Sequence, residues 1–191
     1  MENKVLVEIS ARHVHLSDEH LEVLFGKGHT LTNLKELSQP GQFATEERVT
    51  IKGPKGEMSR VIVLGPTRPE TQVEVSATDA RSLGVSAQIR MSGDIEGTTG
   101  MTLVGPAGTV ELDKGVIVAK RHIHLSDLEA KEYGLEDHQV VSVKIETEQR
   151  SLTFGDVVVR VNPNFKAAMH IDTDEGNAAG IAGSTMGEII K

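Results

Sequence analysis

The chain of 191 residues contains no cysteine. Disulfides, thiolate zinc sites and a cysteine nucleophile are therefore excluded, so any bound metal must be held by histidine, aspartate or glutamate. Positive charge is also scarce, because 20 lysines and arginines stand against 28 aspartates and glutamates, for a formal net charge of −8. This balance argues against a nucleic acid or an anionic membrane as the main partner. No apolar run approaches the roughly 20 residues that a membrane-spanning helix needs.

What the chain does contain is a heptapeptide that occurs twice with one conservative change. Residues 12–18 read Arg-His-Val-His-Leu-Ser-Asp and residues 121–127 read Arg-His-Ile-His-Leu-Ser-Asp, a shift of 122 − 13 = 109 residues. A β-branched run leads into each copy, at 5–9 and at 116–119, so each histidine pair is expected at the end of a strand. Residues i and i+2 of a strand face the same side, so both imidazoles of a pair can reach one ion.

The remaining pattern predicts a mainly β protein with short helices. Ser17 and Ser126 are predicted N-caps of short helices that end at Gly26 and Gly134. Short alternating runs between turn signals follow in both halves and are typical of sandwich or barrel architecture. The clearest of these runs are 48–52, 60–64, 140–145 and 156–161. The duplication favours two small domains, residues 1–100 and 101–191, joined through a glycine-rich segment.

The late strands of the two halves each offer a third potential ligand. Glu74 lies between two valines in the first half, and His170 occupies the comparable strand of the second, 170 − 74 = 96 residues later. Alone, Glu74 would suit the solvent face of an edge strand, and only its equivalence with His170 favours a ligand. Three nitrogen or oxygen ligands with an open position are typical of catalytic zinc, although imidazole-rich sites also suit iron, nickel or copper. The two candidate ligand sets are His13, His15 and Glu74, and His122, His124 and His170.

Arg68 breaks the symmetry between the halves. It lies between Pro66 and Pro69, where the second half has Asn164 at the comparable position. A guanidinium fixed near two metals would suit a phosphate or carboxylate bound through two oxygens. A solvated turn arginine is the alternative, and the pattern leaves both open.

Taken together, these segments resemble the PduL-type phosphotransacylases, also called phosphate propanoyltransferases. The resemblance rests on residues 10–17, 65–68, 72–76, 121–126 and 170–177, which follow in order along nearly the whole chain. It implies two closely packed β-barrel domains and a reversible reaction in which acyl-CoA and phosphate give acyl phosphate and free coenzyme A. The acyl group would be propanoyl or acetyl. The family resemblance also implies at least a dimer, a homo-oligomer.

The same resemblance implies roles for individual residues. His13, His15 and Glu74 would hold one zinc ion and His122, His124 and His170 a second, so that each chain carries two. Arg68 would bind the phosphate, and metal-bound phosphate would attack the thioester directly. Contacts with coenzyme A would come from Ile9, Ser10, Ala11 and Asn177. The resemblance does not include Lys55, but its place in a Gly-Pro-Lys-Gly turn suggests a contact with a nucleotide phosphate.

Two other functions remain open on the residues themselves. A cupin-type metalloenzyme would use Glu19 after the first histidine pair, but Glu19 falls in a predicted helix and the second copy has Leu128 there. A metal-binding module without turnover would instead hold ions whose coordination positions are all filled. The strand that begins near Met1, with neither a signal-peptide core nor a targeting helix before it, predicts a cytoplasmic protein, with a bacterial microcompartment as the alternative location.

Overall fold

The computed structural model describes residues 3–191, and Met1 and Glu2 at the start of the N-terminal segment lie outside the described residues. The chain divides into two compact units. The barrel unit comprises the described residues up to Ser10, Ser38–Pro40 and Lys120–Lys191. The sheet unit comprises Ala11–Leu37 and Gly41–Ala119. Each unit therefore takes residues from both sequence halves.

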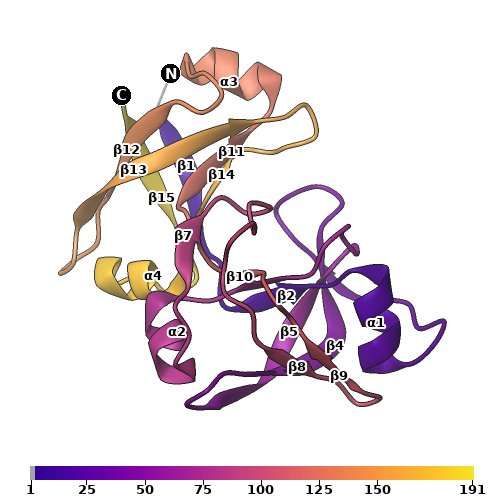
Figure 1. Cartoon of the computed structure of the whole chain (residues 1–191). Coiled ribbons are helices and arrows are strands. Elements are labelled where there is room, and N and C mark those ends of the chain that lie inside the picture. Colours follow the sequence, from indigo (N-terminus) through magenta and orange to yellow (C-terminus); the bar gives the residue numbers. More distant parts are fainter. Residues whose placement is uncertain (1–2) are drawn as a thin grey trace. The chain divides into compact units, whose positions relative to one another are not determined.

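A closed barrel of six strands forms the barrel unit, in the order β1-β14-β11-β13-β12-β15 (Figure 1). Their inward-facing side chains form one apolar core, in which Val7, Ile123, Val143 and Met169 are fully buried. The bounds of the strands are β1 Lys4–Ile9, β11 His122–Leu125, β12 Val140–Ile145, β13 Leu152–Val161, β14 Ala168–Ile171 and β15 Ser184–Ile190.

The sheet unit contains nine strands in a single sheet, with the order β7-β10-β6-β2-β5-β4-β8-β9 and β3 paired to β4. The expectation of a mainly β fold is confirmed, and so is one barrel, but a second barrel is not confirmed because these strands form the nine-stranded sheet. The bounds are β2 His13–His15, β3 Asn33–Glu36, β4 Phe43–Lys52, β5 Glu57–Gly65, β6 Gln72–Glu74, β7 Gln88–Arg90, β8 Thr102–Val104, β9 Thr109–Glu111 and β10 Val116–Ala119.

Within residues 3–191, four short helices each follow a strand, and their ends are capped as their residue types indicate. The helices are α1 Asp18–Phe25, α2 Ala77–Leu83, α3 Asp127–Tyr133 and α4 Thr173–Ala179. The Ser17 side chain accepts a hydrogen bond from the backbone of α1, and Ser126 forms a capping box with Glu129 at α3. Gly26 and Gly134 end these helices with positive φ angles, so both predicted starts and both predicted ends are confirmed.

Each histidine pair is a strand of its own, which corrects the expectation that it ends the preceding apolar strand. β1 stops at Ile9 and β2 begins at His13, while β10 stops at Ala119 and β11 begins at His122. The Ser10 backbone N–H donates to the Ile171 carbonyl at 2.8 Å, which keeps this end of the chain beside β14 while β2 pairs within the sheet unit. β1 and β10 thus each belong to the unit that does not contain the histidines that follow them.

The two histidine strands have matching neighbours within their own units. β2 pairs in parallel with β5 and antiparallel with β6, and β11 pairs in parallel with β13 and antiparallel with β14. On its other edge, each of β6 and β14 pairs in parallel with one more strand, which is β10 in the sheet unit and β1 in the barrel unit. The repeat in the sequence is therefore also a repeat in strand pairing.

No helix within residues 3–191 has both the length and the apolar character that crossing a bilayer demands.

Candidate metal centres

The first cluster, His13, His15 and Glu74, lies in the sheet unit where β2 pairs with β6. Antiparallel pairing sets His13 directly opposite Glu74. The Nε2 atoms of His13 and His15 are 3.2 Å apart, His13 Nε2 lies 3.5 Å from Glu74 Oε2, and His15 Nε2 lies 4.0 Å from Glu74 Oε1. Glu74 is only 8% exposed, so it does not lie on a solvent face. The pleat brings the three side chains to one point, as the i, i+2 spacing predicts.

The second cluster, His122, His124 and His170, has the same construction in the barrel unit. His122 is paired with His170 across β11 and β14, and the Nε2 atoms of His122 and His124 are 2.9 Å apart. One nitrogen of each of the three rings lies within 4.8 Å of the others. Two further polar groups approach His170 Nε2, the Glu8 carboxylate at 3.4 Å and the Ser38 hydroxyl at 3.4 Å.

Backbone carbonyls orient the first histidine of each cluster. His13 Nδ1 donates to the Ala11 carbonyl at 2.9 Å, and His122 Nδ1 donates to the Lys120 carbonyl at 2.7 Å. A carbonyl can only accept, so the proton of the neutral ring sits on Nδ1 and the Nε2 lone pair faces the cluster. Such a partner on the remote nitrogen is the usual arrangement for a metal-binding histidine.

Burial and charge act in opposite directions on the first cluster. Burial would raise the pKa of Glu74, but the imidazoles of His13 and His15 and a hydrogen bond from Ser92 outweigh it and hold this pKa well below its usual range. The pKa of His15 lies well below its usual value because burial, His13 and Arg68 all disfavour the imidazolium. Burial lowers the pKa of His13, yet Glu74 more than compensates and raises it. Glu74 is thus an anion and His15 is neutral, the forms in which both groups bind metals.

Both donor sets fit a divalent ion such as zinc. Nitrogen or oxygen ligands about 2.0–2.1 Å from a tetrahedral ion lie roughly 3.3 Å from one another. The donor separations of 3.2, 3.5 and 4.0 Å in the first cluster, and of 2.9 Å between the paired histidines of the second, lie close to that value. Three protein ligands leave a fourth position for an exogenous group, as in catalytic sites.

Arg68 belongs to a polar network that reaches Glu74, and this network was missed at the level of sequence. Arg68 Nη1 donates to the Ser92 hydroxyl at 3.1 Å, and that hydroxyl donates to Glu74 Oε1 at 2.8 Å. Gln72, which is buried, donates to the same Glu74 oxygen at 2.7 Å. Arg68 is therefore half-buried and hydrogen-bonded to Ser92. The one available signal was Gln72, a polar residue two positions before Glu74 on the same strand face.

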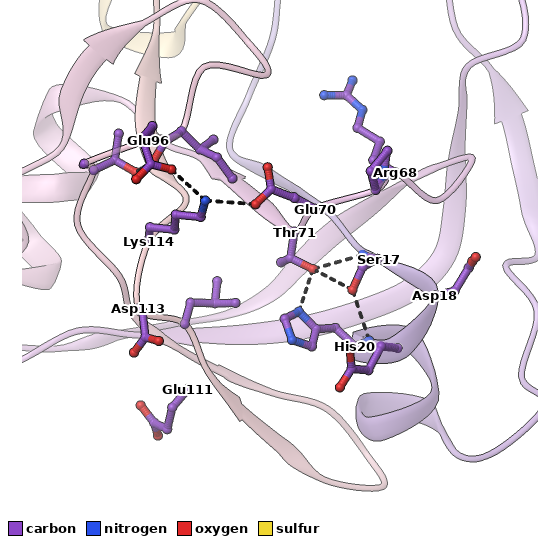
Figure 2. Close-up of a pocket in the computed structure, with 16 residues that line it drawn as sticks. Ser17, Asp18, His20, Arg68, Glu70, Thr71, Glu96, Glu111, Asp113 and Lys114 are labelled. Atoms are coloured by element: carbon purple, nitrogen blue, oxygen red, sulfur yellow. Dashed lines mark hydrogen bonds and ion pairs between the residues drawn. The ribbon is translucent and has the colours of Figure 1, made fainter.

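A cavity of about 790 Å³ opens beside Arg68 in the sheet unit (Figure 2). Figure 2 shows Lys114 between Glu70 and Glu96, at 2.9 Å from each carboxylate, and Thr71 hydrogen-bonded to His20. The carboxylates on the cavity wall are Asp18, Glu19, Glu70, Glu96, Glu111 and Asp113. The guanidinium of Arg68 points away from them in Figure 2. A lining this acidic disfavours the binding of an anion in this cavity.

Comparison with known proteins finds relatives that match nearly the whole chain. The family model for phosphate propanoyltransferase matches residues 6–182. A phosphate propanoyltransferase of Clostridioides difficile is 55% identical over 185 residues, which cover 97% of this chain and 88% of the relative. The enzyme of that name from Thermotoga maritima is 54% identical over 175 residues (92% and 83%), and that from Salmonella typhimurium is 51% identical over 172 residues (90% and 81%).

The chain belongs to the phosphate propanoyltransferase family. Within this family member, the residues expected to contact coenzyme A lie in different units. Ile9 is the last residue of β1 and Ser10 follows it, both in the barrel unit, and Asn177 is an exposed residue of α4 in the same unit. Ala11 and Lys55 belong to the sheet unit, where Lys55 is exposed at the turn between β4 and β5.

The cupin-type alternative is not favoured in this phosphate propanoyltransferase family member. Glu19 lies in α1, is exposed and lines the acidic cavity, whereas the carboxylate that joins His13 and His15 is that of Glu74. The acidic partner of the first histidine pair thus comes from a neighbouring strand and not from the residue four positions after His15.

Proposed function

We propose that this protein is a phosphate acyltransferase that interconverts acyl-CoA plus phosphate with acyl phosphate plus coenzyme A. Propanoyl is the favoured acyl group because the relatives carry it in their names, and acetyl is the alternative. The observation that carries the proposal is the pair of three-ligand clusters on matching strands in a chain of this family. Clusters with an open position suit turnover better than a saturated structural site.

Two zinc ions per chain are part of the proposal. The first cluster, His13, His15 and Glu74, would hold one ion, and the second cluster, His122, His124 and His170, would hold the other. When bound, divalent ions supply positive charge that offsets repulsion between phosphate and coenzyme A and stabilises negative charge on the thioester oxygen. The carbonyls of Ala11 and Lys120 accept hydrogen bonds from Nδ1 of His13 and His122, which leaves Nε2 of both rings available to the ions.

Arg68 is proposed to hold the phosphate for direct attack. A guanidinium can bind two phosphate oxygens at once, and Ser92 limits the directions in which it can point. A phosphate oxygen forms a bond to the acyl carbon, the carbon–sulfur bond breaks, and coenzyme A leaves with the electron pair of that bond. Holding both substrates together removes much of the entropic cost of their encounter, up to roughly 7–11 kcal/mol in well-oriented systems. No acyl-enzyme is needed, and no cysteine exists to form one.

Coenzyme A is proposed to contact Ile9, Ser10, Ala11 and Asn177, with Lys55 near a nucleotide phosphate. We also propose that residues 1–100 and 101–191 are copies of one ancestral unit. Matched pairing supports the duplication, because β2 and β11 have equivalent partners and each is followed by a capped helix.

The proposal is tested by pairing metal analysis with thiol release from propanoyl-CoA, acetyl-CoA and longer acyl-CoAs, each with phosphate present and omitted. We expect zinc at two equivalents per chain and thiol release that requires phosphate. His124→Ala should lower the zinc content to one equivalent, because a two-ligand remnant binds poorly. Equal rates of thiol release with and without phosphate would contradict the proposed reaction, and an unchanged zinc content in His124→Ala would remove that residue from the ligand set.

A further inference from the structure

An arginine precedes the first histidine of each cluster, and its role is not explained by metal binding. Arg12 Nε donates to Asp79 Oδ2 at 2.9 Å and Arg12 Nη2 donates to Asp79 Oδ1 at 2.7 Å, a pair with two parallel hydrogen bonds. Asp79 is buried and is the third residue of α2. This helix starts directly after β6, the strand that carries Glu74.

The barrel unit contains an ion pair between the equivalent residues, made through Nε, while Arg121 Nη1 donates to the Gly155 carbonyl at 3.2 Å. Arg121 precedes His122, and its Nε lies 2.7 Å from Glu175 Oε1. Glu175 is the third residue of α4, which follows β14, the strand that carries His170. The acid follows the third ligand at the same distance in both units, since 79 − 74 = 5 and 175 − 170 = 5.

Both acids also belong to the capping boxes of their helices. Asp79 Oδ2 accepts the Ser76 N–H at 3.4 Å, and Glu175 Oε2 accepts the Asp172 N–H at 2.9 Å. Each acid therefore ties the helix start to the arginine. The contact closes a ring in each unit: histidine strand, third-ligand strand, helix start, acid and arginine.

We propose that Arg12 and Arg121 are positioning residues, each of which sets the zinc affinity of its own cluster by clamping the histidine strand to the helix that follows the third ligand. The inference rests on the proposed metal centres. In the first cluster the clamp limits movement of Glu74 relative to His13, which face each other in the strand pair. In the second it limits movement of His170 relative to His122. A preorganised donor set binds an ion more tightly because less conformational freedom is lost on binding.

The test uses the two clusters as controls for each other. In a His124→Ala background only the first cluster keeps three ligands, and in a His13→Ala background only the second does. Zinc affinity is measured in competition with a chromophoric chelator. Arg12→Met should weaken the first cluster by about tenfold, the lower end of the effect of outer-shell partners, while Arg121→Met changes it by less than about twofold. In the His13→Ala background the two variants should exchange their effects.

Two additional variants separate positioning from folding. Arg12→Lys keeps the charge but loses the paired geometry and should recover part of the affinity. Asp79→Asn keeps an oxygen that can cap α2 and removes the charge, so it should weaken zinc binding about as much as Arg12→Met. The absorption spectrum of the Co²⁺-loaded protein should change in Arg12→Met, because it reports the arrangement of the ligands.

The outcomes are distinguishable from those of the proposed function. Wild-type protein that binds no zinc would overturn both the metal centres and the clamps. Zinc binding in the wild type together with equal affinities in the Arg12→Met and Arg121→Met variants, in either background, would overturn the clamps alone. A fall in the melting temperature of the metal-free Arg12→Met protein without a change in zinc affinity would make the arginine a purely structural residue, and that result also overturns the inference.

Discussion

Arg68 and Glu74 are joined through a single hydroxyl. Ser92 accepts a hydrogen bond from Arg68 Nη1 at 3.1 Å and donates one to Glu74 Oε1 at 2.8 Å. A residue proposed to hold phosphate is thereby tied to a residue proposed to hold zinc. The connection fixes the direction of the guanidinium, while the carboxylate keeps hydrogen bonds from Gln72 and Ser92 that do not depend on the arginine.

Arg68→Ala should therefore weaken phosphate use and leave the zinc content unchanged. A charge-assisted hydrogen bond is worth about 1.5–3 kcal/mol, so we expect the KM for phosphate to rise by about 10- to 100-fold. Initial rates of thiol release at varied phosphate, together with metal analysis of the same samples, measure both quantities. Arg68→Lys is the matched control and should recover only part of the loss, since a lysine cannot bind two oxygens in parallel. Loss of zinc in Arg68→Ala would show that the arginine is structural.

The local elements of this fold were predictable because their signals lie close together in the sequence. Ser17, Gly26, Ser126 and Gly134 begin and end helices as their residue types indicate. The i, i+2 spacing of His13 and His15 also suffices to predict that their rings converge. The grouping of Glu74 with them was inferred from the repeat and is what the strand register shows.

The path of the chain between the units was not predictable from these signals. In the sequence, β1 and β10 each precede a histidine pair and suggest one continuous strand. Instead, β1 pairs with β14 and β10 pairs with β6, and both partners lie far away in the sequence. Hydrophobic alternation gives the face of a strand and not its neighbours. Ser92 was missed for a similar reason, since a serine in a polar loop carries no pattern that connects it to Glu74.

Phosphate and coenzyme A should raise the thermal stability of the zinc-loaded protein. A ligand that binds only the native state at 100 times its Kd contributes about 2.7 kcal/mol, which corresponds to a rise in Tm of roughly 5–10 °C for a chain of this size. Differential scanning fluorimetry with each ligand, and with sulfate as an anion control, measures the shift. A metal-binding module without turnover predicts no response to coenzyme A, and that result would favour it.

Glu47 should contribute stability that is lost in acid. Burial would raise the pKa of Glu47, but hydrogen bonds from His29 and from Thr32 outweigh it and lower this pKa below its usual value. A lowered pKa means that the contribution is present above the pKa of the unfolded chain and disappears as the pH falls through the folded value. Urea unfolding from pH 7 to pH 3 should thus show a stability difference between wild type and Glu47→Gln that shrinks toward acid. Glu46→Gln, at an exposed neighbouring position, is the control and should show no such trend.

Gly100 should be intolerant of even a methyl group. A Cβ at this position would lie 1.7 Å from the Leu112 carbonyl oxygen and 2.6 Å from its carbon. The Leu112 N–H donates to the Met101 carbonyl at 2.9 Å, so the two backbone segments cannot separate without losing this bond. Gly100→Ala should lower the free energy of unfolding by about 1–3 kcal/mol, the usual cost of overpacking. Gly155→Ala is the matched control, because a Cβ there meets nothing within 4 Å, and its effect should stay within about 0.5 kcal/mol. Urea denaturation of both variants decides the matter, and equal midpoints would show that the backbone near Leu112 yields at little cost.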